Sequence, residues 1–270
     1  MTEIIKIAAG QSVTLDPLQS GFAHGYGLFE TIQMRQRKLS FWLPHWARLQ
    51  HSAQCLGLPL TCSATAVLQA IGELVAADAI DSALIKLSLV REGQACRLFV
   101  YVRPLGAVPA VAELRFDPAC PINQYSILAG HKTHNYMENM SLQATARAAG
   151  AYDVLRVNTA GELAETTIGN IFFVVDGALS TPALATGILP GVIRQEIIAL
   201  HGATHQGQFH ADRIQQAEAA FLTHSGCGIL PVSSIVGPSF VQHYASAEHP
   251  LLLRLQADLM RAERAAWQAV

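Results

Sequence analysis

Residues 161–175, GELAETTIGNIFFVV, form the stretch that decides how the chain is interpreted. Residues 162–165 and the apolar, β-branched run at 169–175 predict strands, and an Asp-Gly dipeptide directly after the second of these predicts a tight turn. Glu165 has apolar or small neighbours in this stretch. A carboxylate in such surroundings can pair with a protonated ring nitrogen, whereas a strand-edge glutamate that faces solvent is the ordinary alternative.

Outward from this stretch, β-rich runs alternate with amphipathic runs of helical period in both halves of the chain. We expect further strands at 28–34, 39–42, 83–90, 97–103, 124–129, 153–158, 219–223 and 229–236. We expect helices over 43–57, 64–77, 136–149 and 247–266, and one that begins after Pro190-Gly191. Alternation of this kind predicts an α/β or α+β fold.

Residues 104–122 contain four prolines and separate the two halves. This composition predicts a linker or a crossover between domains. We therefore expect two lobes, an N-terminal α+β lobe over residues 1–115 and a C-terminal lobe over residues 116–270. A ligand is expected in the cleft between them.

The composition excludes several classes of protein. The 270 residues are 51% hydrophobic and 14% charged, with a formal net charge of −2, which argues against disorder and against nucleic acid or an anionic membrane as a partner. The five cysteines contain no C-x-x-C pair, so reduced thiols are expected rather than a disulfide framework or a zinc ribbon. With no signal peptide and no transmembrane segment evident, we expect a soluble, cytoplasmic protein without a metal site.

Three segments carry residues that suit a phosphate-bearing cofactor. The turn at 187–194 leads directly into a helix, whose first N–H groups suit a phosphate. The segment 223–228, THSGCG, offers hydroxyls and backbone N–H groups for a second phosphate contact. Lys132, at the expected end of a strand, can lose its proton and attack a carbonyl group. A helix boundary, a loop tip of small residues and a solvated lysine are the ordinary alternatives.

Taken in order, these segments resemble the class IV aminotransferase family, the fold-type IV enzymes that use pyridoxal phosphate. The resemblance extends from about residue 20 to residue 237. The segments that carry it are GFAHGYGLFET at 21–31, HWARL at 45–49, Lys132 with Asn135-Tyr136, ETTIGNIF at 165–172, Thr181-Pro182, GILPGVIR at 187–194 and ILPV at 229–232.

The resemblance implies a role for each matching residue. Lys132 would form the Schiff base with pyridoxal 5′-phosphate, Glu165 would keep the pyridine nitrogen protonated, and Leu189 would pack on the ring. The phosphate would be held by Arg48, Ser225 and the N–H groups of Val192 and Ile193. Small amino-bearing carboxylates would be the substrates, and a homodimer would be the assembly.

Two stretches bear on the reaction. Thr31 follows Glu30 in FETI, and Lys132 is followed by THNYMEN. Both resemble the 4-amino-4-deoxychorismate lyases of this family, which release pyruvate and p-aminobenzoate on the folate route, and Thr31 would supply a hydroxyl for positioning or proton transfer. An aminotransferase for D-amino acids or branched-chain amino acids is the alternative, because it shares the first catalytic steps. A non-catalytic relative is disfavoured, because Lys132, Glu165 and Arg48 are all present.

The substrate side departs from the family pattern. His24 and Tyr26 stand where many relatives have Tyr and Asp, and both are candidates for the wall of the substrate pocket. The segment VREGQACR at 90–97 loosely matches a stretch that leads to a carboxylate-binding arginine. Arg97 is the candidate, one residue out of register, and Arg91 is the alternative. A strand-end arginine with no such role is as well supported as either.

Overall fold

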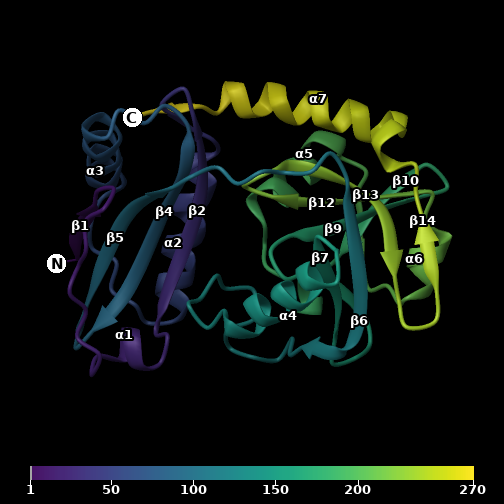
Figure 1. Ribbon diagram of the computed structural model, residues 1–270, viewed down its shortest axis with the longest axis horizontal. Helices are drawn as coiled ribbons and strands as arrows, with labels where there is room; N and C mark the ends of the chain where they lie inside the picture. Colours follow the sequence, from purple (N-terminus) through teal and green to yellow (C-terminus); the bar gives the residue numbers. More distant parts are fainter. Residues whose placement is uncertain (1) are drawn as a thin grey trace. The chain divides into compact units, whose positions relative to one another are not determined.

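The computed structural model describes residues 2–270, which form two compact units (Figure 1). Unit 1 comprises the residues up to Ala107 together with His131–Asn135 and Ala262–Val270, and unit 2 comprises Val108–Gly130 and Tyr136–Arg261. The sequence suggested a single boundary near residue 115, with each lobe formed by one continuous stretch of chain. In the structure, two segments beyond that boundary belong to unit 1. One of these segments contains Lys132.

Unit 1 contains a six-stranded sheet with the strand order β1-β5-β4-β2-β3-β15. Antiparallel ladders join β2, β4 and β5, whereas β1 runs parallel to β5. In β2, β4 and β5 most buried side chains lie at alternate positions, which is the pattern of a sheet with one covered face. The strands are β1 (Glu3–Ile7), β2 (Gly27–Arg35), β3 (Lys38–Leu39), β4 (Ala83–Glu92), β5 (Ala95–Arg103) and β15 (Gln268–Ala269).

Two helices, α2 (Trp42–Cys55) and α3 (Ala64–Ala77), pack on one face of this sheet and share a single core with it. The bounds of α3 confirm the predicted helix, and Ser63 caps its N-terminus by accepting a hydrogen bond from the N–H of Ala66 at 3.1 Å. The strand expected at 39–42 is wrong beyond residue 39. Phe41 has a left-handed φ of 50°, which ends the extended chain one residue before α2 begins.

A short helix, α1 (Ser20–Ala23), precedes β2 in unit 1. The turn between β2 and β3 places Gln36 and Arg37 at φ values of 52° and 54°. Two consecutive left-handed residues match the twist of a two-residue hairpin, which joins β2 to β3 although neither residue is a glycine.

Unit 2 contains a nine-stranded sheet in the order β11-β10-β9-β12-β13-β6-β7-β8, with β14 paired to β13. Its strands are β6 (Ala112–Ile122), β7 (Asp153–Asn158), β8 (Leu163–Thr166), β9 (Asn170–Val175), β10 (Ala178–Pro182), β11 (His205–Gly207), β12 (Ala219–His224), β13 (Gly228–Val236) and β14 (Val241–His243). Buried side chains of β6, β7, β9, β12 and β13 form most of its core. Phe172 and Phe221, on neighbouring strands, stack with ring centroids 4.8 Å apart.

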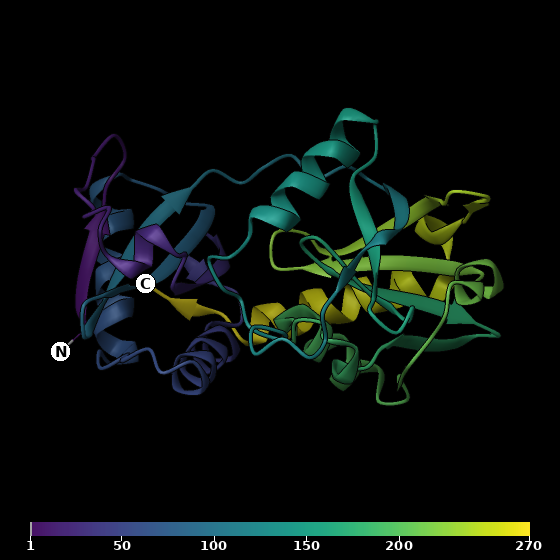
Figure 2. The same ribbon diagram turned by 90° about the horizontal axis from the view of Figure 1, so that it is seen from below.

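Unit 2 also contains helices, of which the one at 212–216 was not predicted from the sequence. They are α4 (Met137–Ala148), α5 (Val192–His201), α6 (Asp212–Gln216) and α7 (Pro250–Ala265), whose last residues belong to unit 1. Figure 2 shows α4, in teal, as a separate helix beside the sheet, where Ala146 is buried with Val154 of β7. The mixed α/β fold predicted from the sequence is confirmed.

The linker expected over residues 104–122 is wrong in its second half. β6 occupies Ala112–Ile122 and pairs in parallel with both β7 and β13. Pro118 and Pro121 fall between Asp117 and Ile122, where the register with β7 shifts. Because proline cannot donate to a ladder, the prolines lie in the irregular part of the strand rather than outside it.

The strand expected at 124–129 is also wrong, because these residues form consecutive turns. The side chain of Asn123 accepts from the N–H of Tyr125 at 3.0 Å, and Ser126 Oγ accepts from the N–H of Leu128 at 3.1 Å. Such bonds from a side chain to the nearby backbone compete with a strand ladder. Tyr125 and Ile127 consequently remain exposed.

All five cysteines are free, which confirms the prediction of reduced thiols. Among the helices of residues 2–270, none combines the length and the apolar character that a membrane crossing requires.

Candidate active site

Lys132 lies on a short segment of unit 1 that pairs with the edge of β2. The N–H of Phe29 donates to the Lys132 carbonyl at 2.9 Å, and the N–H of His134 donates to the Gly27 carbonyl at 2.9 Å. A Cβ at Gly27 would lie 2.7 Å from His134 Nδ1, so only glycine permits this close approach. The backbone of Lys132 is therefore held in place although no strand precedes it.

The phenyl ring of Phe29 is surrounded by polar side chains of unit 1. We call Phe29, Thr31, Lys86, Lys132 and His134 the Phe29 cluster. Lys132 Nζ lies 4.3 Å and Lys86 Nζ lies 4.2 Å from the ring centroid, and the His134 ring stacks with its centroid 5.9 Å away. Attraction between an ammonium group and an aromatic face offsets part of the cost of removing each charge from water.

The Phe29 cluster shifts the titration of two of its members. Burial, together with the charges of Lys132 and Arg103, lowers the pKa of Lys86 to about 7. Burial and the charge of Lys86 lower the pKa of His134 to about 4. At neutral pH, His134 is therefore uncharged, and a substantial fraction of Lys86 has lost its proton.

Thr31, the predicted catalytic hydroxyl, is hydrogen-bonded to Lys86. The two residues are directly opposite in the antiparallel ladder of β2 and β4, so their side chains project from the same face of the sheet. Lys86 Nζ donates to Thr31 Oγ1 at 2.6 Å. The sequence reasoning did not select Lys86, because its position opposite Thr31 depends on a strand register that alternation alone does not fix.

Arg48, predicted to bind phosphate, is held on the opposite face of the sheet by Glu30. Glu30 is 1% exposed and accepts hydrogen bonds from Arg48 Nε at 2.8 Å, from Arg48 Nη2 at 2.7 Å and from His45 Nδ1 at 2.8 Å. Burial opposes ionisation of Glu30, but the charges of Arg48 and His45 outweigh it and hold the pKa of Glu30 well below its usual range. Sequence reasoning missed this role of Glu30, although the HWARL segment contains both of its partners.

In unit 2, the carboxylate of Glu165 is fixed by the neighbouring chain. Its Oε2 accepts from Asn170 Nδ2 at 2.9 Å and from the N–H of Leu189 at 3.1 Å. Asn170 Nδ2 also donates to the Leu189 carbonyl at 2.9 Å. These three residues, two of them predicted from the sequence to contact the cofactor, thus form one hydrogen-bonded group.

The turn between Glu165 and Asn170 is anchored from beneath by α4 and β7. The Thr167 carbonyl accepts from Tyr136 at 2.7 Å and from Asn139 at 2.7 Å, while the Thr167 hydroxyl donates to the buried carboxylate of Asp153 at 2.5 Å. Tyr136 and Asn139 both lie in the THNYMEN stretch selected from the sequence, although no supporting role was assigned to them. Asp153 was not selected, because its distance in sequence from the turn gave no local signal.

The start of α5 provides the expected backbone N–H groups. Gly191 is the N-cap residue, and the N–H groups of Val192 and Ile193 lie in the first turn, where no carbonyl of the helix can accept them. A Cβ at Gly191 would lie 2.1 Å from Asn170 Oδ1. Glycine is therefore required where the chain passes Asn170 and enters the helix.

The segment that contains Ser225 is shaped by His224. His224 Nδ1 accepts from the N–H of Gly226 at 3.1 Å, so in the neutral ring Nε2 carries the proton and donates to the Tyr152 oxygen at 2.9 Å. Within residues 2–270, the buried hydroxyl of Thr223 has no hydrogen-bond partner. An uncompensated hydroxyl in this segment is consistent with contact to a polar ligand.

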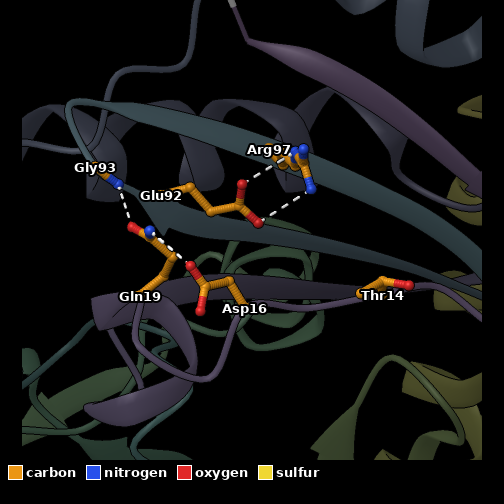
Figure 3. Close-up of a pocket in the computed structure, with 6 residues that line it drawn as sticks. All are labelled: Thr14, Asp16, Gln19, Glu92, Gly93 and Arg97. Atoms are coloured by element: carbon orange, nitrogen blue, oxygen red, sulfur yellow. Dashed lines mark hydrogen bonds and ion pairs between the residues drawn. The ribbon is translucent and has the colours of Figure 1, made fainter.

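The two candidate substrate arginines are engaged elsewhere in unit 1. Arg97 Nε lies 3.0 Å from Glu3 and 3.1 Å from Glu92. Arg97 and Glu92 line a pocket of about 620 Å³. Figure 3 shows them with the other lining residues, Thr14, Asp16, Gln19 and Gly93. Arg91 donates to the carbonyls of Gly93 at 2.7 Å and Gly57 at 3.1 Å. Neither arginine belongs to the Phe29 cluster.

His24 and Tyr26, the other substrate candidates, lie between α1 and β2. Both side chains are exposed, and the hydroxyl of Tyr26 donates to the Leu56 carbonyl at 3.1 Å. The guanidinium of Arg91 lies 5.9 Å from the centroid of the Tyr26 ring. These contacts fix Tyr26 and Arg91 relative to each other within unit 1.

The predicted cofactor residues thus occur in two groups, one in each unit. Lys132 and Arg48 belong to unit 1, whereas Glu165, the first N–H groups of α5 and the segment with Ser225 belong to unit 2. An amine, a cation, a fixed carboxylate and several N–H donors are the groups that pyridoxal 5′-phosphate requires. Two further observations agree with a phosphate-bearing ligand. Among residues 2–270, the Thr223 hydroxyl has no hydrogen-bond partner, and the chain passes so close to Asn170 at residue 191 that only glycine is accommodated.

The chain is similar to proteins of one known family. A family profile described as Amino-transferase class IV matches residues 27–235. An aminodeoxychorismate lyase of Vibrio harveyi is 25% identical over 241 residues, which cover 80% of this chain and 86% of that protein. A D-alanine aminotransferase of Bacillus licheniformis is 24% identical over 259 residues, which cover 90% of this chain and 89% of that protein.

A solved structure from Legionella pneumophila, provisionally named a 4-amino-4-deoxychorismate lyase, superposes with a TM-score of 0.87. It is 28% identical and covers 97% of this chain and 100% of its own. The family match begins at the first residue of β2 and ends near the end of β13, so it contains every residue assigned above to the cofactor. The chain belongs to the class IV aminotransferase family, whose cofactor is pyridoxal 5′-phosphate.

Proposed function

We propose that this protein is a lyase that converts 4-amino-4-deoxychorismate into p-aminobenzoate and pyruvate. The observation that carries the proposal is the Phe29 cluster, in which Lys132 and Lys86 lie against one ring and Lys86 donates a hydrogen bond to the hydroxyl of Thr31. The lyase reaction needs a base for the proton on the amine-bearing carbon and a proton donor for the departing enolpyruvyl group. The cluster supplies one candidate for each need.

Each residue has a separate task in this reaction. Pyridoxal 5′-phosphate, when bound, withdraws electrons from the amine-bearing carbon of the substrate. Lys132, once its amine is free, takes the proton from that carbon, and Thr31 donates to the oxygen of the leaving group. Glu165 is held in place by hydrogen bonds from Asn170 and Leu189, and its negative charge would stabilise the protonated ring nitrogen of the cofactor. Formation of the aromatic ring of p-aminobenzoate favours release of pyruvate.

An aminotransferase for D-amino acids or branched-chain amino acids is the second candidate. The similarity to a D-alanine aminotransferase is almost as high in identity as the similarity to an aminodeoxychorismate lyase and covers more of the chain. The shared residues Lys132, Glu165 and Arg48 serve both reactions. The two reactions differ in what happens to the substrate after proton removal. A transaminase passes the amino group to a second keto acid, whereas a lyase needs no such acceptor.

The proposal includes a cytoplasmic homodimer that acts on the folate route. In solution, a dimeric mass at working concentration is expected. A fully active monomer would contradict the dimer without affecting the assignment of the reaction.

The test is a pyruvate assay with purified, cofactor-loaded protein and 4-amino-4-deoxychorismate, with no keto acid present. Many turnovers of pyruvate are expected, and none from Lys132→Ala, which controls for spontaneous breakdown of the substrate. If pyruvate forms only stoichiometrically, and amino-group transfer appears when a keto acid is added, the lyase assignment is wrong and the transaminase is correct.

A further inference from the structure

We propose that Lys86 is a positioning residue that binds the oxygen of Thr31 and directs its O–H toward the molecule that reacts at Lys132. The inference rests on the proposed function, because it explains how Thr31 becomes the proton donor of that reaction. Lys86 is assigned no direct contact with the cofactor. Its effect is transmitted through one hydroxyl.

The placement of the two residues is set by the sheet. Thr31 and Lys86 are a directly opposed pair of β2 and β4, and Tyr101 of β5 continues the same row. The neighbouring positions Glu30 and Leu87 point to the covered face instead, where both are buried. Thr31 and Lys86 therefore project together from the face that α2 and α3 leave uncovered.

The hydrogen-bond chemistry of the pair leaves one proton available. In its ammonium form Lys86 can only donate, so in that form it occupies a lone pair of Thr31 Oγ1, at 2.6 Å. Within the described residues 2–270, Lys86 is the one hydrogen-bond partner of the Thr31 side chain. The Thr31 O–H is thus left for a bound molecule, and the adjacent positive charge makes that O–H a stronger donor.

The sequence makes the position of Lys86 unusual. The chain has four lysines, Lys6, Lys38, Lys86 and Lys132. Lys6 pairs with Glu73 and Lys38 lies over Trp267, whereas the other two both lie against the ring of Phe29. Half of the lysines of the chain are therefore gathered on one phenyl ring, where like charges repel each other.

The charges that face Lys86 disfavour its ammonium form. Burial has the largest effect, the charges of Lys132 and Arg103 add to it, and Glu30 on the other face of the sheet compensates only in part, so that the pKa of Lys86 falls to about 7. His134, the remaining titratable group of the cluster, stays uncharged at neutral pH. A lysine kept in such a position for stability alone would be costly, and perturbed groups of this kind concentrate at functional sites.

The kinetic test is a double-mutant cycle that uses Lys86→Met and Thr31→Val. We expect each single variant to lose about tenfold to hundredfold in kcat for pyruvate release, with little change in KM. The double variant should lose no more than either single variant, because Lys86 acts through Thr31. Thr31→Ser retains the hydroxyl and should recover most of the activity, whereas Lys86→Met should be equally deleterious in the serine background.

A second measurement is independent of activity and of the cofactor. With lysine labelled by ¹³C at Cε, NMR of the cofactor-free protein resolves four amines, and Lys86→Met identifies the signal of Lys86. Its midpoint is expected near pH 7, and Thr31→Val should shift that midpoint downward, because the lost hydrogen bond stabilised the charged form. Circular dichroism of each variant verifies that the fold is retained.

The outcomes separate the inference from the proposed function. Additive losses in the double variant, or a large rise in KM for Lys86→Met, would overturn the inference and indicate that Lys86 binds the substrate directly. A Lys86 midpoint that Thr31→Val leaves unchanged would also overturn it. If the wild-type protein releases no pyruvate, the lyase function fails, and the NMR titration still decides whether Lys86 and Thr31 interact.

Discussion

Glu30 and Thr31 are consecutive residues of β2 whose side chains point to opposite faces of one sheet. Glu30 accepts hydrogen bonds from His45 and Arg48 of α2, and Thr31 accepts one from Lys86 of β4. The alternation of side chains along a strand produces this arrangement. A single strand thereby fixes the arginine proposed for the phosphate on one face and the hydroxyl proposed for proton donation on the other.

The first prediction concerns the stability that Glu30 provides. Glu30→Gln should lower the free energy of unfolding by about 2–4 kcal/mol at pH 7, because it leaves the charge of Arg48 partly buried without its partner. Urea denaturation of the cofactor-free protein measures this. Glu73→Gln, which removes an exposed carboxylate paired with Lys6, is the control and should cause no resolvable change.

The pH dependence of this effect has a definite sign. The pKa of Glu30 in the folded protein lies below its ordinary value of 4.5, so its stabilising effect is fully present above pH 4.5 and is lost as the pH falls toward the folded pKa. The difference between wild type and Glu30→Gln should therefore be largest above pH 5 and shrink in stronger acid. A difference that grows on acidification would contradict the buried ion pair.

The second prediction identifies the lysine that binds the cofactor. Reduction of the loaded protein with borohydride should add the mass of one reduced cofactor to the wild type and nothing to Lys132→Ala. Lys86→Met should gain the same mass as the wild type, because Lys86 is not proposed to form the covalent bond. Attachment that persists in Lys132→Ala and disappears in Lys86→Met would reverse the roles of the two lysines.

How much of the fold follows from the sequence depends on how local the determining contacts are. The helix at 64–77 was predicted with its observed bounds, because Ser63 and the apolar period are local signals. The strand at 124–129 was wrong, because Asn123 and Ser126 bind the backbone two residues ahead and favour turns. β6 was missed because its prolines suggested a linker, and its pairing with β7 and β13 is not local.

The third prediction concerns Asn170, which holds the carboxylate of Glu165. Asn170→Ala should reduce kcat about tenfold or more, because the carboxylate loses the donor that orients it. Glu165→Gln should retain the cofactor and reduce turnover further. Asn123→Ala, which removes a side chain that also binds the backbone but in an exposed turn, should leave the kinetics unchanged. Asn170→Ala with wild-type kinetics would show that Glu165 needs no such support.

The fourth prediction is that Lys86→Met stabilises the protein while impairing its activity. The pKa of Lys86 falls from 10.5 to about 7 on folding, so between pH 7 and pH 10.5 the unfolded chain binds more protons, and wild-type stability rises with pH in this window. The gain in free energy of unfolding of Lys86→Met over the wild type should therefore be larger at pH 6 than at pH 10, by on the order of 1–3 kcal/mol. Parallel curves of stability against pH would contradict the lowered pKa.

The candidate site was predictable where its residues lie in contiguous motifs. Lys132, Glu165 and Ser225 each lie in a recognisable segment, whereas Lys86 and Asp153 are brought to their partners by strand register and by packing beneath a turn. Arg97 and Arg91 were selected from a loose motif, and the structure shows each engaged by carboxylates or carbonyls of unit 1. A motif identifies a residue type, but its partners are fixed by the pairing of strands.

The most direct test of the central claim is the stoichiometry of the products. Purified, cofactor-loaded protein is supplied with 4-amino-4-deoxychorismate and no keto acid, and pyruvate and p-aminobenzoate are measured together over time. We predict that the two products appear in equal amounts over many turnovers and that Lys132→Ala forms neither. Absence of p-aminobenzoate from a yellow, folded protein, with amino-group transfer on addition of a keto acid, would contradict the lyase assignment.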